Sequence, residues 1–248
     1  MTVYEKLKTI LPNEDFIYFG DLKNCPYGQK SKEQLVDLTS EIFNYFQMQE
    51  VKAVVMACNT TSANVYDEYK NAFDYKLYPI IQTCAKVISE QPIKRLGVFA
   101  TSATISSGAY KREISLHNPD IEVFEMACPG WVQIVEENKQ DEDLSIAVVK
   151  ENLDRMLQYN PDKIILGCTH YPFLLDVLTK FVSKDLFIDP SIYFAQYIKQ
   201  DLEQYGLLNG NGGQEEFLVS ANPEEFRVAA KMFYNLKENP KLIQFAMV

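Results

Sequence analysis

Two stretches of the sequence place a cysteine and small hydrogen-bonding side chains directly after an apolar run. The run 51–56 leads to Ala-Cys58-Asn-Thr, and the run 163–166 leads to Gly-Cys168-Thr-His-Tyr-Pro. Branched apolar runs of this length predict buried parallel strands, so each cysteine is expected at the carboxyl end of a strand, where open α/β sheets bind ligands. Because the cysteines are 168 − 58 = 110 positions apart, the spacing predicts two similar halves with a site between them.

A matched pair of thiols favours a catalytic role for the two cysteines over a purely structural one. A single free cysteine is most often a small buried apolar residue. Two cysteines that are each followed by Asn or Thr, and each expected beside a helix N-terminus that lowers the thiol pKa, are not explained by packing alone. Two opposed acid/base groups can remove a proton from one face of a carbon and supply a proton to the other face. That reaction inverts a stereocentre.

The other titratable residues fall into two groups. His170 is two positions from Cys168 and is predicted to orient or activate that thiol. Asp21 follows a predicted strand at 16–19, and on residue type alone both Asp21 and Glu136 fit a solvated carboxylate as well as a functional one. The residues predicted to be structural or solvated are Cys25, Cys84, Cys128 and His117.

The composition limits the class of partner and the compartment. The chain has 248 residues, is 47% hydrophobic and carries a net charge of −10, which argues against a nucleic-acid or anionic-membrane surface. No apolar run reaches the roughly 18 residues of a membrane span, and the first residues do not resemble a signal peptide, so a cytoplasmic protein is expected. Five widely spaced cysteines without a CxxC pair, and only two histidines, argue against disulfides and against a metal site.

The apolar periodicity predicts strands that alternate with helices, which is typical of a doubly wound α/β fold. Strands are predicted at 16–19, 51–56, 78–81, 95–100, 121–126, 163–166, 186–189 and 217–220. Helices are predicted at 3–11, 32–49, 60–73, 84–90, from 101, and at 141–159, 173–182, 192–205 and 223–236. In the helix at 141–159, Leu144, Ala147, Val148, Leu153 and Leu157 are expected to form the buried face. We expect residues 1–81 plus 191–248 to form one domain and residues 82–190 an inserted second domain.

Over essentially its whole length the chain resembles the glutamate racemases of the aspartate/glutamate racemase superfamily. The resemblance is carried by Tyr18-Phe-Gly-Asp21, Pro26-Tyr-Gly28, Ala57-Cys-Asn-Thr60, Cys128-Pro129 through Val135-Glu136, Gly167-Cys-Thr-His-Tyr-Pro172 and Asn222-Pro-Glu-Glu-Phe226. The two cysteine motifs at this spacing are highly specific. His170 after Cys-Thr is similar to the glutamate branch, since the aspartate branch usually carries an acidic residue there.

The resemblance implies two doubly wound α/β subdomains, related by a pseudo-twofold axis, with the active site in the cleft between them. It also implies a cofactor-independent racemisation of glutamate in which Cys58 and Cys168 alternate as acid and base, with Asp21, Glu136 and His170 tuning the thiols. The residues it assigns to substrate binding are Tyr27, Gly28, Asn59, Thr60, Thr169 and His170. The product, D-glutamate, would supply peptidoglycan synthesis in a bacterial cytosol, and a homodimer is compatible with the family.

The sequence departs from the family at its start. Family members open with a strand that runs into an Asp-Ser-Gly-x-Gly-Gly turn, and this sequence begins just after that turn. We therefore expect badly impaired activity, mainly in the Cys58 half-reaction, which restoring the upstream residues would rescue. Two alternatives stay open: another racemase of the superfamily, acting on aspartate, a hydantoin or a malonate-type acid, and a non-catalytic binding or regulatory remnant of the fold.

A two-thiol mechanism needs neither pyridoxal phosphate nor a metal. Treatment with EDTA, followed by removal of bound small molecules by dialysis, should leave the rate of glutamate racemisation unchanged within about twofold, since the thiols supply the acid and the base. Polarimetry before and after treatment measures this. Loss of turnover on chelation, restored by one added metal, would contradict the prediction.

Overall fold

The computed structural model describes residues 1–244, in which parallel strands alternate with helices. The strands are β1 Phe16–Gly20, β2 Ala53–Met56, β3 Lys76–Pro79, β4 Arg95–Ala100, β5 Glu122–Ala127, β6 Lys163–Gly167, β7 Phe187–Ile188, β8 Glu215–Val219 and β9 Lys241–Leu242. The α-helices are α1 Thr2–Ile10, α2 Lys32–Met48, α3 Asn59–Tyr69, α4 Ile80–Ser89, α5 Ser102–Ser106, α6 Ala109–His117, α7 Trp131–Glu136, α8 Asp143–Leu157, α9 Leu175–Leu178, α10 Pro190–Gln204 and α11 Pro223–Ala230. Short 3₁₀ turns cover Tyr27–Gln29, Tyr171–Leu174 and Lys184–Leu186. Every described strand pair is parallel, which confirms the predicted α/β class.

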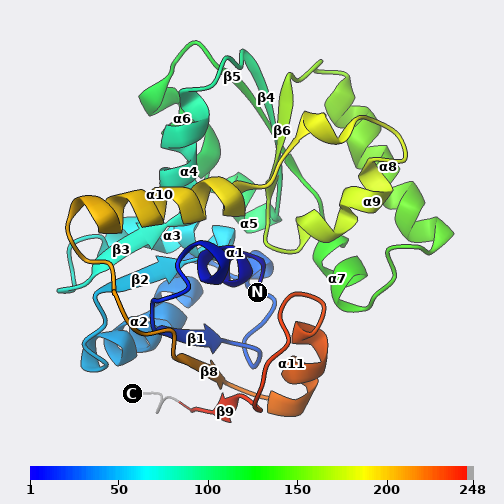
Figure 1. The fold of residues 1–248 in the computed structure, drawn as a ribbon. Coiled ribbons are helices and arrows are strands. Elements are labelled where there is room, and N and C mark those ends of the chain that lie inside the picture. The colour runs from blue at the N-terminus through cyan, green and yellow to red at the C-terminus, as the bar shows by residue number, and fades with distance from the viewer. Residues whose placement is uncertain (245–248) are drawn as a thin grey trace.

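One sheet, in the order β5-β4-β6-β7, is buried on both faces. Leu96 and Val98 of β4 pack into a core with α4 and α6, whereas Phe99 of the same strand packs with α8 on the opposite face. Figure 1 shows α4 and α6 on one side of this sheet and α8 and α9 on the other. A strand covered on both faces must be apolar where it is buried, which explains the apolar run at 164–166 that follows the partly exposed Lys163.

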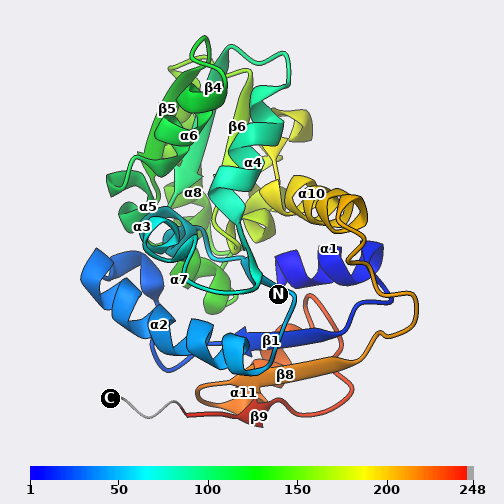
Figure 2. The same ribbon diagram turned by 90° about the vertical axis from the view of Figure 1, so that its left-hand side faces the viewer.

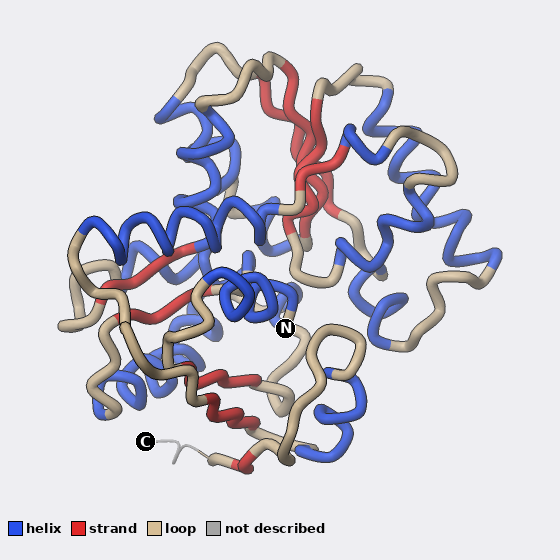
Figure 3. Tube along the Cα trace, viewed as in Figure 1, coloured by secondary structure: helices blue, strands red, loops and turns tan. Residues whose placement is uncertain are grey.

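The remaining described strands form two separate sets, β1-β8-β9 and β2-β3. Figure 3 shows these sets as distinct groups of red segments below the larger sheet. The strands β4 to β7 all fall within residues 82–190, and the others fall outside that range. This partition agrees with two subdomains, while the exact domain boundaries remain a prediction.

Helices α1 and α10 join the sheets to one another. Tyr4 of α1 lies edge-on to Phe16 of β1 and to Phe217 of β8, with ring centroids 5.5 and 5.2 Å apart. One turn further along α1, Leu7 packs in the same core as Phe194 of α10. Figure 2 shows α1 between the β1-β8 strands and α10. The first helix therefore links the small sheet to the main core.

One predicted strand is wrong at its end. Residues Ile80 and Ile81 were expected to continue a strand, but β3 ends at Pro79 and both isoleucines begin α4. Branched apolar residues suit a buried strand and a buried helix face equally well at this length. Both side chains are buried in the main core, at 1% and 0% exposure, so packing rather than local preference decides the conformation.

The buried face of α8 also differs from the prediction. Leu144, Ala147 and Val148 are exposed, whereas Leu153 is buried as predicted, together with Val149 and Met156. Both sets obey helical spacing, and the face that is buried is the one whose Val149, Leu153 and Met156 pack with Phe99 of β4 in one core. The sequence did not predict three of the described elements, which are α6, α7 and β9. Two predicted helices are shorter than expected. The one at 173–182 is an α-helix only over Leu175–Leu178, and the one at 223–236 ends at Ala230.

Among the described residues, no helix has the length and apolar character that a bilayer crossing requires. The helix α2, for example, has 17 residues and includes Glu33, Asp37 and Glu41.

A charged cluster fastens α10 to β3. Asp201 of α10 accepts hydrogen bonds from the Nζ of Lys76, at 2.7 Å, and from the hydroxyl of Tyr78, at 2.6 Å. Burial raises the pKa of Asp201, but the bonds from Lys76 and Tyr78 lower it by more, so the net shift is below the ordinary value. The carboxylate therefore stabilises the fold above its unfolded pKa of about 3.9 and loses that contribution as the pH falls through its lower folded value.

Replacement of this carboxylate should weaken the fold in a pH-dependent way. Asp201→Asn should lower the free energy of unfolding by about 1–3 kcal/mol at pH 7, because hydrogen bonds to a charged acceptor are replaced by neutral ones. The loss should stay constant down to about pH 5 and shrink below about pH 4. Urea unfolding at each pH measures it. The exposed pair Lys150–Asp154 supplies the control, Asp154→Asn, which should change stability by no more than about 0.5 kcal/mol; equal losses in both variants would contradict the prediction.

Candidate active site

Cys58 lies between β2 and α3 and is half-buried. It occupies the N-cap position of α3 with extended backbone angles, and its side chain makes no capping hydrogen bond. The N–H groups of the first turn of α3 have no partner within the helix, so this end can receive an anionic group. The structure therefore places a thiol and a set of free backbone donors at one point, as the sequence predicted.

Cys168 follows β6 and is 8% exposed. Burial raises the pKa of its thiol to about 12; the backbone N–H of His170 opposes this rise, and the charge on Cys58 adds to it. The expectation that a helix N-terminus lowers the pKa of both thiols is thus wrong for Cys168. The next element is a four-residue 3₁₀ turn, Tyr171–Leu174, and the loss of hydration outweighs the local N–H groups.

His170 connects Cys168 to Glu136. The sulfur lies 3.7 Å from Nδ1 of His170, and Nε2 of the same ring lies 3.4 Å from Oε1 of Glu136. Glu136 is the last residue of α7, and its side chain is half exposed. With the ring proton on Nε2 facing the carboxylate, Nδ1 is free to accept the thiol proton, so the three side chains can move a proton between the sulfur and the surface.

Asp21 organises the loop after β1. Its carboxylate accepts hydrogen bonds from the hydroxyl of Tyr27 at 2.5 Å, from the amide of Asn24 at 2.9 and 3.0 Å, and from the hydroxyl of Ser220 at 2.7 Å. Burial, then the bond to Asp21, raises the pKa of Tyr27 well above its ordinary value, so the phenol stays neutral. Among the described residues Asp21 makes no hydrogen bond to Cys58. Its direct effect is to hold Tyr27, and a tuning role toward the thiols stays a prediction.

A cluster of hydroxyl groups lies at the start of α3. Thr60 Oγ1 is 3.0 Å from Thr101 Oγ1 and 3.4 Å from Thr104 Oγ1, and Thr101 and Thr104 are 3.0 Å apart. Gly28 lies against this cluster, since a Cβ there would come within 2.9 Å of the Cβ of Thr101. Thr101 and Thr104 were not predicted as site residues. The sequence did contain a signal that could have identified them: like the two strands that lead to the cysteines, β4 is followed directly by hydroxyl side chains.

Asn59 is the most informative polar residue of the site. It is 3% exposed, its Oδ1 accepts a hydrogen bond from the hydroxyl of Tyr110 at 2.7 Å, and its Nδ2 has no partner. Asn59 and Cys168 line the same narrow crevice, as does Thr169. A buried amide without a partner is rare in proteins, so Nδ2 is available to an incoming acceptor.

The remaining cysteines differ in their surroundings. Cys84 is buried and donates to the carbonyl of Pro190 at 3.3 Å, which fits the predicted structural role. Cys128 is also buried, and burial raises its pKa, with the charge on nearby Cys168 adding to the rise. His117 is exposed, as predicted. No group of three or more His, Cys, Asp or Glu side chains within residues 1–244 is arranged to hold a metal ion.

The chain matches one protein family and a set of curated and solved relatives. The profile of the Asp/Glu/Hydantoin racemase family matches residues 1–197. A protein named glutamate racemase 2, from Caldanaerobacter subterraneus, is 36% identical over 240 residues, which cover 96% of this chain and 90% of that protein.

Two solved structures share the fold. The glutamate racemase of Francisella tularensis, crystallised with D-glutamate, has a TM-score of 0.89 and 33% identity, with 99% of this chain and 93% of that chain covered. A glutamate racemase isoform from Bacillus anthracis has a TM-score of 0.91 and 26% identity, with 98% and 92% covered.

The raised pKa of Cys168 predicts its reactivity. In the folded protein without ligand, alkylation of Cys168 by iodoacetamide should rise about tenfold per pH unit up to pH 10 without a plateau, because the thiolate fraction keeps growing below a pKa of about 12. Peptide mass spectrometry measures the rate. The control is the same cysteine in guanidinium chloride, where the rate should level off near about pH 8.5. A plateau below pH 9 in the folded protein would contradict the raised pKa, since the thiolate fraction would already have reached its maximum.

Proposed function

Because the chain belongs to the Asp/Glu/hydantoin racemase family, we propose that it is a cofactor-independent glutamate racemase that uses Cys58 and Cys168 as its acid/base pair. The resemblance seen in the sequence is confirmed by these relatives. Glutamate as the substrate is supported by the curated relatives, which are glutamate racemases, and by the Francisella tularensis structure with D-glutamate.

The single observation that carries the proposal is the partnerless amide of Asn59. Asn59 directly follows Cys58 in the chain, its Nδ2 is buried without a partner, and Asn59 and Cys168 both line one narrow crevice. An amino-acid carboxylate bound there would accept from Nδ2 and from the free N–H groups that begin α3, which satisfies donors that are otherwise unpaired. The same position would hold the α-carbon near both sulfurs.

The proposed reaction transfers one proton in each direction. One sulfur, as a thiolate, removes the proton from the α-carbon, and the electron pair of that bond moves toward the carboxylate. The other sulfur, as a thiol, gives its proton to the opposite face of the carbon, so the two sulfurs exchange protonation states in each turnover. For the reaction that starts from a Cys168 thiolate, Nδ1 of His170 accepts the thiol proton, Glu136 stabilises the charged imidazole that results, and the ammonium group of the substrate favours the charged sulfur.

The proposed biological role is the supply of D-glutamate for peptidoglycan synthesis in a bacterial cytoplasm. The relatives come from bacteria, and D-glutamate has no source in ordinary protein turnover. Tyr27, Gly28, Thr60 and Thr169 are proposed to bind the substrate together with Asn59. A homodimer remains a prediction.

Each sulfur should be necessary for turnover. Cys58→Ser and Cys168→Ser should each lower the rate of racemisation by at least about 10²- to 10⁴-fold, because an alcohol is a far weaker acid/base group at neutral pH than a thiol. Circular dichroism of L- and D-glutamate measures the rate. With a glutamate analogue that carries a leaving group, one variant should process only the D form and the other only the L form. Cys84→Ser, at a buried cysteine outside the site, is the control and should retain activity.

Isotope exchange tests the two-base scheme directly. In D₂O the product should carry deuterium at the α-carbon from the first turnovers, while recovered substrate should keep its original hydrogen, since each sulfur serves one face. Early return of the original hydrogen into the product would contradict two separate bases. Turnover of aspartate or a hydantoin instead of glutamate would assign another racemase activity, and binding of glutamate without turnover would favour the non-catalytic alternative.

A further inference from the structure

We propose that Tyr110 is a positioning residue, which fixes the side-chain amide of Asn59 so that Nδ2 faces the bound substrate. The inference rests on the proposed function of the Cys58 and Cys168 site. It concerns a residue that lies outside both cysteine motifs and is 51 positions from Asn59.

Tyr110 meets Asn59 from a different part of the fold. It belongs to α6, is fully buried, and donates its hydroxyl hydrogen to Asn59 Oδ1 at 2.7 Å. Burial raises the pKa of Tyr110 well above its ordinary value, so the phenol keeps its proton at neutral pH. It therefore remains a hydrogen-bond donor.

The hydroxyl selects one of the two orientations of the amide. With Oδ1 toward Tyr110, the phenol hydrogen has an acceptor and Nδ2 points away from it. In the reversed orientation the amide would donate to the phenol oxygen, and the phenol hydrogen would be left in a buried site without its present acceptor. Since Nδ2 has no protein partner among the described residues, the bond to Tyr110 is the contact that decides which end faces the substrate.

The ring of Tyr110 reaches Asn59 because Gly167 has no side chain. A Cβ at Gly167 would lie 3.0 Å from Cε2 of Tyr110 and 2.8 Å from the carbonyl oxygen of Phe99. The glycine that precedes Cys168 thus leaves the space through which the ring crosses the end of β6. Tyr110 therefore connects the two cysteine motifs, since its ring packs against Gly167 and its hydroxyl binds Asn59.

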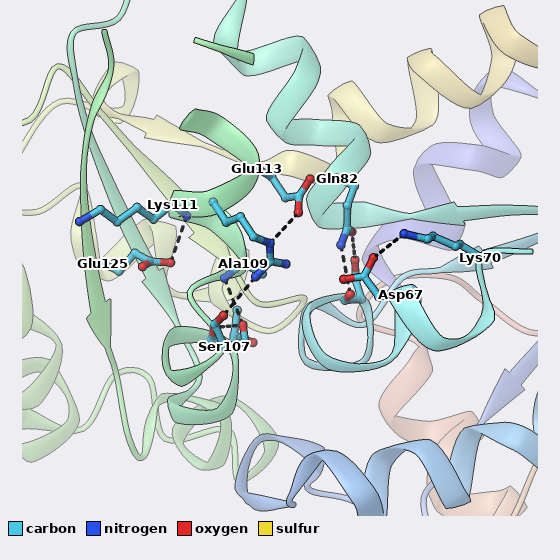
Figure 4. Close-up of polar contacts among 11 residues, drawn as sticks. Asp67, Lys70, Gln82, Ser107, Ala109, Lys111, Glu113 and Glu125 are labelled. Carbon is cyan, nitrogen blue, oxygen red and sulfur yellow. Dashed lines mark hydrogen bonds and ion pairs between the residues drawn. The ribbon is translucent and has the colours of Figure 1, made fainter. Parts of the chain in front are cut away.

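Polar contacts at the first turn of α6 hold Tyr110 in place. The N–H of Ala109 donates to Ser107 Oγ at 3.2 Å, and the N–H of Lys111 donates to Oε1 of Glu125 at 3.4 Å. Figure 4 shows these contacts on either side of position 110, with Glu125 on the neighbouring strand. The backbone of Tyr110 is therefore fastened to β5 and to the loop before α6, which gives its hydroxyl a defined position.

The test is Tyr110→Phe, which removes the hydroxyl and keeps the ring against Gly167. The KM for glutamate should rise about tenfold, with kcat changed by less than about threefold, because the amide contributes to binding in the ground state and the transition state alike. In an Asn59→Ala background, Tyr110→Phe should add no further loss, since both changes remove one interaction. Tyr75→Phe is the matched control: Tyr75 is a buried tyrosine that donates to the carbonyl of Phe43, away from the site, and its KM should not change.

A second variant tests the amide without touching Tyr110. Asn59→Asp keeps an acceptor for the phenol but has no Nδ2, so its KM should rise at least as much as in Tyr110→Phe. The proposal is overturned by an unchanged KM in either variant, by the same rise in Tyr75→Phe, or by additive losses in the double variant. The starting protein is assayed first: absence of glutamate turnover and of calorimetric binding would contradict the proposed function itself, whereas turnover that is indifferent to Tyr110→Phe contradicts only the positioning role.

Discussion

The structure of the site depends on the close packing at the carboxyl end of β6. The backbone there approaches Phe99 and the ring of Tyr110 so closely that only glycine fits at position 167. This contact places Cys168 directly against the core, and it also lets α6 reach the beginning of α3 through Asn59. The absence of a side chain at Gly167 therefore allows the contact between the two halves of the site.

Burial and ionisation oppose each other at Cys168. The dry surroundings that give the sulfur a defined position also favour its neutral form. The groups that can take up the proton of this thiol lie toward the surface, since the side chains of His170 and Glu136 are 33% and 50% exposed. The arrangement places the buried sulfur at one end of a short series of titratable groups and water at the other, so a proton has a route that does not cross the core.

The sequence carried enough information for most of the strands and for the positions of both thiols after them, because a buried parallel strand is largely apolar and ends where polar residues begin. It could not reveal that Tyr110, Thr101 and Thr104 contact Asn59 and Thr60, since these contacts join residues about 40 to 50 positions apart. The wrong conformation at Ile80 and the wrong face at Leu144 have a similar origin. In both cases the local sequence fitted two alternatives equally well, a strand or a helix at Ile80 and either of two helix faces at Leu144, and tertiary packing selected one of them.

The pairing of β1 with β8 has a consequence during synthesis of the chain. Phe16 pairs with Glu215, which lies 215 − 16 = 199 residues later. At a synthesis rate of about 5–20 residues per second, β1 waits roughly 10–40 s for this partner. The sheet formed by β4 to β7 comes from one continuous stretch and leaves the ribosome complete before β8 is made. Throughout that interval the aromatic strand β1 lacks its partner, and a strand in that state pairs readily with other chains, so the chain is open to aggregation until β8 has been made.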